Sequence, residues 1–103
     1  MNFNKGEIGV TLRVDAGQDI SSASTVLIIA EPEVGTAKEF TATVPAVTVT
    51  VDNITYTANE YAEYTTINED DLDYVGRWRM KLKATFSATD VSQTNYVKFR
   101  VLA

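Results

Sequence analysis

The fold of this chain is decided by the stretch Asn68-Glu-Asp-Asp-Leu-Asp-Tyr-Val-Gly-Arg-Trp-Arg-Met-Lys-Leu-Lys83, which joins an acidic corner to a strand with two unlike faces. From residue 77 onward, apolar residues alternate with basic ones in the period of two that a β-strand requires. The pattern predicts a strand over residues 77–86 whose basic side faces solvent. Its buried side would consist of Trp78, Met80, Leu82, Ala84 and Phe86.

The residues ahead of this strand predict a corner between two sheets. Asn68 is placed to cap a single helical turn, and the carboxylates that follow suit the positive end of that turn. Ile67 and Leu72 occupy the two positions of a hydrophobic staple. Gly76 would give the backbone the freedom needed to leave a tight corner.

Short segments with strand patterns, separated by turn residues, account for most of the remaining chain. Strands are predicted at residues 8–14, 25–30, 38–44, 47–51, 54–57, 61–67 and 95–102. The segment 25–30 is almost entirely apolar, so we expect it to be buried on both faces. Asp52-Asn53 joins two of the strands into a hairpin. Residues 87–94 are expected to form a polar loop, and no α-helix longer than one turn is predicted.

Residues 1–103 are therefore predicted to form a single all-β domain, an immunoglobulin-like antiparallel β-sandwich of seven or eight strands. In such domains the corner before strand F carries a tyrosine whose hydroxyl bonds to upstream backbone. Here Trp78 stands at that place, and its indole N–H can donate but not accept a hydrogen bond. A specific bond stays open, and a simple role as the largest core side chain is favoured over a ligand-binding role.

Composition excludes several kinds of chemistry. The chain has no cysteine, so it can form no disulfide, and no histidine, which removes the commonest general base and metal ligand. We therefore expect no enzymatic activity and no cofactor. The acidic run 69–73 suggests calcium, but its spacing differs from an EF-hand loop, so a solvated corner is favoured there and at Asp15 and Asp19.

The amino-terminal residues lack an apolar segment of the length of an export signal, and no stretch of the sequence approaches a membrane span. We therefore expect the protein to be made in a cytoplasm and to have no membrane partner.

Charge is divided unevenly along the chain. Residues 1–76 hold three basic and thirteen acidic residues, a net charge of −10, whereas residues 77–103 hold six basic residues and one acidic residue, a net charge of +5. If the last two strands pair in antiparallel fashion, all six cations share one outer sheet face. We call this set the basic stripe: Arg77, Arg79, Lys81, Lys83, Lys98 and Arg100.

Three interpretations of the basic stripe stay open. Neighbouring carboxylates such as Glu31, Glu39 or Glu63 would neutralise it across the sheet. Alternatively, it docks on the acidic face of another subunit. Nucleic-acid binding is disfavoured, because a protein with a pI of about 4.5 repels phosphate at long range.

The hairpin around Asp52-Asn53 is a second candidate contact region, because its outer face is uncharged and favours β-structure. An exposed edge of this kind could pair with another chain, although an ordinary polar surface would have the same composition. The residues concerned are Thr48, Thr50, Thr55 and Thr57.

Three short motifs carry a resemblance to a known group. Gly6-Glu7-Ile8-Gly9, the run from Val14 to Ser21 (Val-Asp-Ala-Gly-Gln-Asp-Ile-Ser) and Asp70-Asp71-Leu72-Asp73-x-x-Gly76 resemble segments of small structural proteins of tailed bacteriophages. They are also similar to the immunoglobulin-like amino-terminal module of phage baseplate upper proteins. The loop Glu31-Pro32-Glu33-Val34-Gly35 departs from the Lys-Pro-Asp-Gly hairpin common in that group.

The resemblance implies a non-enzymatic virion protein, either a capsid decoration (cement) subunit or a neck, tail or baseplate accessory. Its partners would be other virion proteins, with a homo-oligomer as a further possibility, and it would reach the particle from the host cytoplasm. The alternative is an adhesin module for host-surface carbohydrate. Its candidate sugar-stacking aromatics are Tyr56, Tyr61, Tyr64 and Tyr74.

Overall fold

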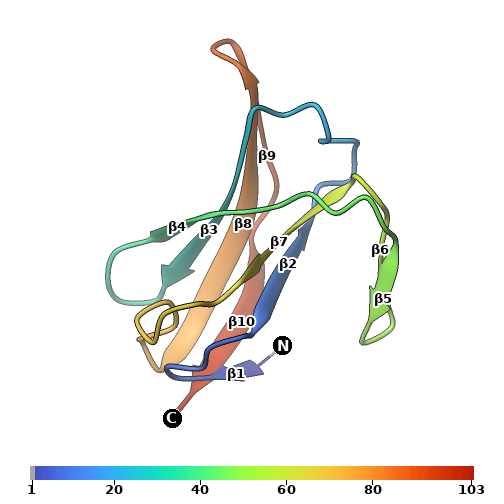
Figure 1. Cartoon of the computed structure of the whole chain (residues 1–103). Helices are drawn as coiled ribbons and strands as arrows, with labels where there is room; N and C mark the ends of the chain where they lie inside the picture. Colours follow the sequence, from blue (N-terminus) through green and yellow to red (C-terminus); the bar gives the residue numbers. More distant parts are fainter. Residues whose placement is uncertain (1) are drawn as a thin grey trace.

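The computed structural model describes residues 2–103 and contains, within that range, ten β-strands and no helix (Figure 1). The all-β prediction is confirmed. The strands are β1 (Asn2–Asn4), β2 (Thr11–Asp15), β3 (Thr25–Pro32), β4 (Lys38–Thr41), β5 (Val49–Val51), β6 (Ile54–Tyr56), β7 (Tyr61–Thr65), β8 (Gly76–Ser87), β9 (Asp90–Gln93) and β10 (Val97–Leu102). None of the described elements is a helix long and apolar enough to cross a membrane.

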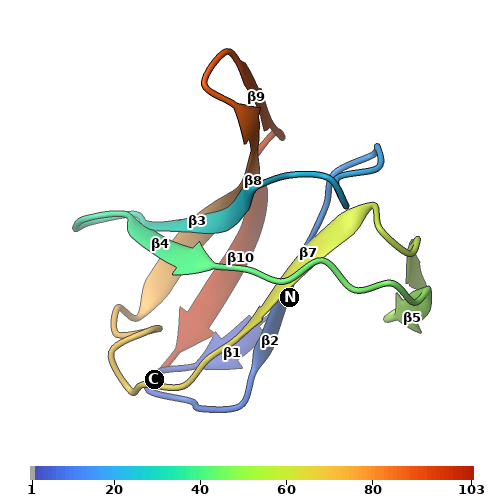
Figure 2. The same cartoon turned by 45° about the horizontal axis from the view of Figure 1, so that its top comes forward.

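The strands form one large sheet, one small sheet and a separate hairpin. The large sheet has the order β1-β10-β8-β3-β4, with β9 pairing beside the far end of β8. Strand β1 runs parallel to β10, and the other pairs in this sheet are antiparallel. The β2–β7 pair forms a second layer over the large sheet, and the β5–β6 hairpin projects at the side (Figures 1 and 2). This arrangement is compatible with a β-sandwich.

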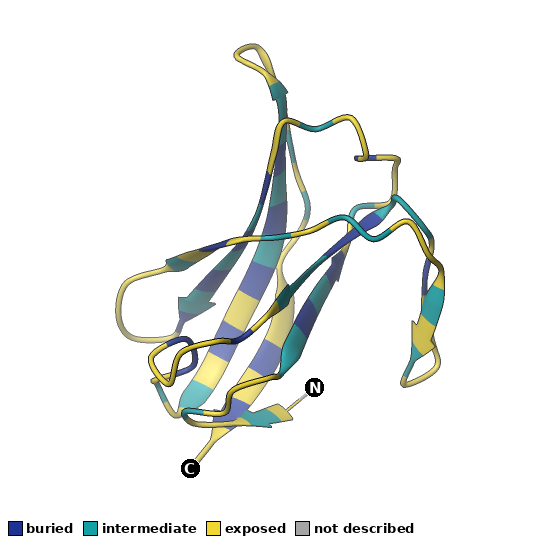
Figure 3. Cartoon of the chain, in the orientation of Figure 1, coloured by how far each residue is buried: buried dark blue, intermediate teal, exposed yellow. Residues whose placement is uncertain are grey.

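One core lies between the two layers, and β8 supplies its centre. Trp78, Met80, Leu82 and Ala84 are all buried, and they alternate with exposed or half-buried residues as the sequence predicts (Figure 3). They pack with side chains of β2, β3 and β10 in one apolar cluster. Burial of these side chains, worth about 1.5–3 kcal/mol each, holds the layers together.

Strand β3 corrects one expectation. Val26, Ile28 and Ala30 are buried, but Leu27 and Ile29 are only half-buried, so the strand is not covered on both faces. The reason is that the large sheet is antiparallel here and has one face turned to solvent, as such sheets often do. The apolar run of β3 therefore contributes partly exposed residues to the outer face.

The predicted polar loop at 87–94 is also wrong, because half of it, Asp90–Gln93, forms β9. Strand β8 pairs with β9 up to Lys83↔Gln93 and with β10 from Met80↔Val97. Between these two pairs, the three residues 94–96 lie opposite only two residues of β8. The chain therefore forms a β-bulge with one extra residue here. The bulge reverses the alternation between β9 and β10, and it turns Tyr96 toward the outer face of the sheet.

The corner before β8 is built around a carboxylate. Asp71 is only 8% exposed, and its Oδ2 accepts hydrogen bonds from the backbone N–H groups of Ile67 (3.0 Å) and Asn68 (3.2 Å) and from the hydroxyl of Tyr64 (2.9 Å). The turn is therefore satisfied by Asp71, whereas the sequence favoured Asn68 as the cap. Ile67 is 67% exposed and Leu72 is fully buried, so the predicted staple is not formed either.

Trp78 makes the specific bond that the sequence left open. Its indole Nε1–H donates to the carbonyl oxygen of Tyr74 at 2.8 Å, four residues upstream. Gly76 lies between them with φ of 138°, and a Cβ at this position would come within 2.9 Å of the Tyr74 ring. A glycine is needed here both for the backbone conformation and for the space.

The hairpin prediction is confirmed by β5 and β6. Asp52 and Asn53 have φ values of 52° and 65°, the two left-handed residues that a type I′ turn requires. Strand β2 begins at Thr11, later than the predicted residue 8, and β1 was not predicted.

Candidate docking surface

The basic stripe lies on the outer face of the large sheet. Arg77, Arg79, Lys81 and Lys83 alternate with the buried residues of β8, so all four point away from the core. Strand β10 adds Lys98 and Arg100, which alternate with the buried Phe99 and Val101. The structure therefore brings together all six cations selected from the sequence.

Two pairs of these cations stand directly opposite one another. The register places Arg100 beside Arg77 and Lys98 beside Arg79 across the β8–β10 pair. Side chains in such positions have Cβ atoms about 4.5–5.5 Å apart, and like charges there are destabilising. In the isolated domain this surface is electrostatically unfavourable.

Neighbouring carboxylates relieve only a small part of this repulsion. Glu31 on β3 accepts from Arg79 at 2.7 Å (Nη2) and 3.2 Å (Nε). Glu63 lies in the small sheet and pairs with Arg13 at 3.2 Å, while Glu39 makes no ion pair with any other described residue. Within residues 2–103, the five other cations of the stripe have no carboxylate oxygen within 4.0 Å.

An aromatic side chain that the sequence analysis missed lies over the stripe. The Tyr96 ring centroid is 4.0 Å from the Arg79 guanidinium carbon and 5.0 Å from the Lys81 ammonium nitrogen. These are cation–π distances. The signal was present in the sequence, because Tyr96 has the same period-two phase as Lys98 and Arg100.

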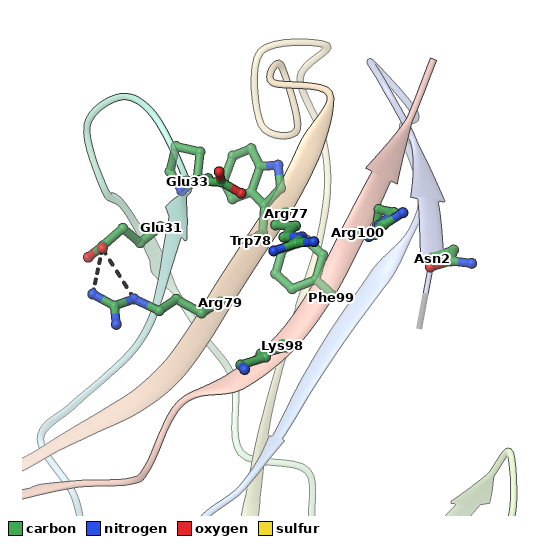
Figure 4. A pocket seen from close by; sticks show the side chains of 10 residues that line it. Asn2, Glu31, Glu33, Arg77, Trp78, Arg79, Lys98, Phe99 and Arg100 are labelled. Carbon is green, nitrogen blue, oxygen red and sulfur yellow. Dashed lines mark hydrogen bonds and ion pairs between the residues drawn. The ribbon is translucent and has the colours of Figure 1, made fainter.

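A groove of about 690 Å³ runs over the paired parts of β8 and β10 (Figure 4). Its charged and polar lining residues are Asn2, Glu31, Glu33, Arg77, Arg79, Lys98 and Arg100. Figure 4 shows the cations along the two strands and Glu31 bonded to Arg79 at one side. The groove thus offers several cations together with a smaller number of carboxylates.

The threonine-rich hairpin lies away from the stripe, at the other side of the molecule (Figures 1 and 2). Thr50 and Thr55 face one another, with their hydroxyl oxygens 3.2 Å apart, and Thr48 accepts a bond from the Ala58 N–H at 3.0 Å. All four threonines selected from the sequence, Thr57 included, are exposed. Strands β5 and β6 pair only with each other among the described strands, so each has an open edge.

The acidic corner does not present its carboxylates as one ligand set. Asp71 points inward, and Lys38 contacts both the Asp73 carboxylate (3.3 Å) and the backbone oxygen of Asp70 (2.6 Å). In the part of the chain that the structure describes, no three acidic side chains are arranged to hold a metal ion.

Burial and hydrogen bonding oppose one another at Asp71. Burial raises the pKa of the Asp71 carboxyl, but the bonds from Ile67, Tyr64 and Asn68 outweigh it and leave that pKa below its usual value. Burial, together with the bond to Asp71, raises the pKa of Tyr64 to about 12. The Asp71 carboxylate and the Tyr64 phenol are thus held in the charged and neutral forms that bond to each other.

Comparison of the chain with protein-family models, with curated proteins and with solved structures finds no match.

Proposed function

We propose that the protein is a small, non-enzymatic structural component of a tailed-phage particle, which docks through its basic stripe on acidic surfaces of other virion proteins. The resemblance of the three short motifs supports the phage assignment and a place as a capsid decoration subunit or as a neck, tail or baseplate accessory. The chemistry of the sheet face supports the docking mechanism.

The observation that carries the proposal is the pair of like-charged contacts, Arg77 with Arg100 and Arg79 with Lys98. Like charges placed directly opposite one another are destabilising in the isolated domain. Carboxylates of a partner would convert this repulsion into charge-assisted hydrogen bonds, which arginine forms in bidentate geometry. Such complementarity fixes the register of a docked partner.

The same groove favours a protein partner over nucleic acid. Glu31 and Glu33 line it beside the cations, and the whole chain has a net charge of −5. A uniformly anionic polymer would meet these carboxylates as well as the arginines. A protein surface that carries mainly acidic and some basic side chains can pair with both the cations and the carboxylates of the groove.

We further infer that the sandwich is of the immunoglobulin-like type. The order β10-β8-β3-β4 corresponds to strands G, F, C and C′ of that fold, and the β2–β7 pair corresponds to B and E. The bond from Trp78 to the Tyr74 carbonyl takes the place of the tyrosine-corner bond. Docking through an outer sheet face suits this architecture, because no other described strand covers that face.

The test is the double variant Arg77→Gln/Arg100→Gln, compared with Ser22→Glu/Ala46→Glu, which alters exposed loop residues. Both variants change the net charge from −5 to −7. We expect the arginine variant to lose at least about 90% of its incorporation and the loop variant to keep it. The readout is the copy number per purified particle by quantitative mass spectrometry. Equal copy numbers for the arginine variant and the wild-type chain would overturn the docking mechanism.

A further inference from the structure

A second cavity, of about 470 Å³, lies away from the groove, where the loop after β2 meets the junction of β9 and β10. It is lined by residues 15–18 and Ile20 of the loop, by Leu82 of β8, and by residues 92–97. Its volume is within the range of about 300–1,000 Å³ that is typical of small-molecule sites. The proposed docking mechanism makes no use of it.

Local hydrogen bonds fix the two walls of this cavity. In the loop, Asp15 Oδ1 accepts from the Gly17 N–H at 2.9 Å, and the Ile20 N–H donates to the Asn59 carbonyl at 2.9 Å. The opposite wall is shaped by the β-bulge, in which Thr94 Oγ1 accepts from the Leu82 N–H at 3.0 Å. Gln18 Nε2 donates to Ser92 Oγ at 3.2 Å and connects the walls. The cavity is therefore formed before any ligand arrives.

The lining combines an apolar floor with a neutral polar rim. Its larger aliphatic residues are Ile20 and Leu82, which are each only 1% exposed, and Val97, which is 41% exposed. The rim carries the side-chain amide of Asn95, which makes no side-chain hydrogen bond to another described residue, whereas Gln93 stands opposite Lys83 and therefore faces the outer side of the sheet. Asp15 is its one ionisable carboxylate, and none of the lining residues is cationic. An anionic ligand would find no counter-charge in this cavity.

We propose that this cavity binds a neutral saccharide. A sugar ring has an apolar C–H face, which suits the apolar surface that Val97 exposes, and an edge of hydroxyl groups that both donate and accept hydrogen bonds. The Asn95 amide offers both a donor and an acceptor to such hydroxyl groups, and the Asp15 carboxylate offers an acceptor. Tyr96 also lines the cavity, but its ring lies over Arg79 on the outer face of the sheet, so the saccharide contacts are assigned to the polar and aliphatic residues of the lining.

This site differs from the one expected from the sequence. Tyr56 and Tyr61 are buried against each other, with ring centroids 5.4 Å apart, and Tyr64 is stacked on Phe40 at 4.3 Å. Tyr74 is only half-buried, but its ring lies against the Gly76 backbone. None of these four tyrosines lines the cavity. The proposed saccharide contacts are therefore polar and aliphatic side chains of the cavity rather than an aromatic ring.

The experiment is a titration of the full chain with methyl glycosides of glucose, galactose, rhamnose and N-acetylglucosamine, each to about 50 mM, followed by two-dimensional ¹⁵N NMR. Binding with a Kd near 1 mM, about −4 kcal/mol, would perturb the side-chain amides of Gln18 and Asn95 and the loop backbone. We expect Asn95→Ala to raise the Kd at least tenfold. Asn4→Ala, a matched change at exposed β1, should leave the Kd unchanged.

Three outcomes would overturn the proposal: no perturbation by any of the four glycosides, perturbations that map outside residues 15–20 and 92–97, or an unchanged Kd in Asn95→Ala. A failure of the saccharide proposal can be distinguished from a failure of the docking proposal. Arg77→Gln/Arg100→Gln leaves the cavity lining intact and should bind the glycosides as the wild-type chain does.

Discussion

The acidic corner and the basic stripe both concentrate charge of one sign, but they differ in where that charge finds its partners. At the corner, Asp71 receives three hydrogen bonds from within the domain, and Asp73 pairs with Lys38. On the stripe, Arg77 and Arg100 face each other, and no carboxylate oxygen of the described residues lies within 4.0 Å of either. The charges at the corner therefore stabilise the fold, whereas the charges on the stripe are available to a partner.

Removing the corner carboxylate should have the largest effect. We expect Asp71→Ala to lower the free energy of unfolding by about 3 kcal/mol, because two backbone N–H groups and the Tyr64 hydroxyl lose a charged acceptor in a buried site. Asp70→Ala, at the exposed neighbouring position, should change it by less than about 0.5 kcal/mol. Urea unfolding of the two variants measures the difference, and similar values would show that the corner does not depend on Asp71.

Adding a methyl group at Gly76 should weaken the corner by a smaller amount. A Cβ would meet the Tyr74 ring, and φ of 138° is a conformation that residues with side chains rarely adopt. We expect Gly76→Ala to cost about 2 kcal/mol. Gly17→Ala is a useful comparison, because its φ is also positive but the space around it is open. Equal losses in the two variants would assign the cost to backbone conformation alone.

The Asp71–Tyr64 pair predicts how stability depends on pH. Because the pKa of Asp71 is lowered by folding, its contribution is present above the unfolded value of about 3.9 and is lost as pH falls through the folded value. Because the pKa of Tyr64 is raised to about 12, its contribution is present below pH of about 10 and is lost between about 10 and 12. The urea midpoint should therefore fall at both extremes. Tyr64→Phe should reduce the alkaline decrease, and an unaltered alkaline curve would contradict the assignment.

The smallest effect on stability is expected on the stripe, and it should have the opposite sign. Arg77→Gln removes one member of a like-charged pair, so we expect the free energy of unfolding to stay constant or to rise by about 0.5 kcal/mol. The rise should diminish with added salt, which screens exposed charges. A loss of more than about 1 kcal/mol would mean that the stripe, like the corner, finds its partners within the domain.

Local patterns predicted the parts of the fold that depend on local sequence. The alternation in β8 and the turn at Asp52-Asn53 were predicted because period and turn chemistry are properties of neighbouring residues. The shared face of the six cations followed from the same period on two strands. By contrast, whether the outer face of β3 is covered depends on distant elements, so the pattern of residues 25–30 could not decide it.

The features that the sequence did not predict depend on contacts between residues far apart in the chain, or on small differences between similar residues. Residues 69–73 contain four carboxylates, and their sequence does not show which one accepts the hydrogen bonds of the corner. Asp71 does so because the tertiary position of Tyr64 and the path of the backbone bring the donors to it. The second cavity is closed by a bond between Gln18 and Ser92, 74 residues apart. Strand β9 escaped prediction because its polar sequence pairs with the extended end of β8, and polar residues alone favour a loop.

What the basic stripe and the second cavity share is a dependence on the length of the segment 94–96, which forms the bulge, rather than on the identity of its residues. Deleting one residue there, with the β8–β9 pairing kept, would exchange the two faces of β10 and direct Lys98 and Arg100 toward the core. The same deletion would remove the wall of the second cavity. A change of one residue in length would thus disable docking and saccharide binding together, whereas each point substitution proposed above separates them.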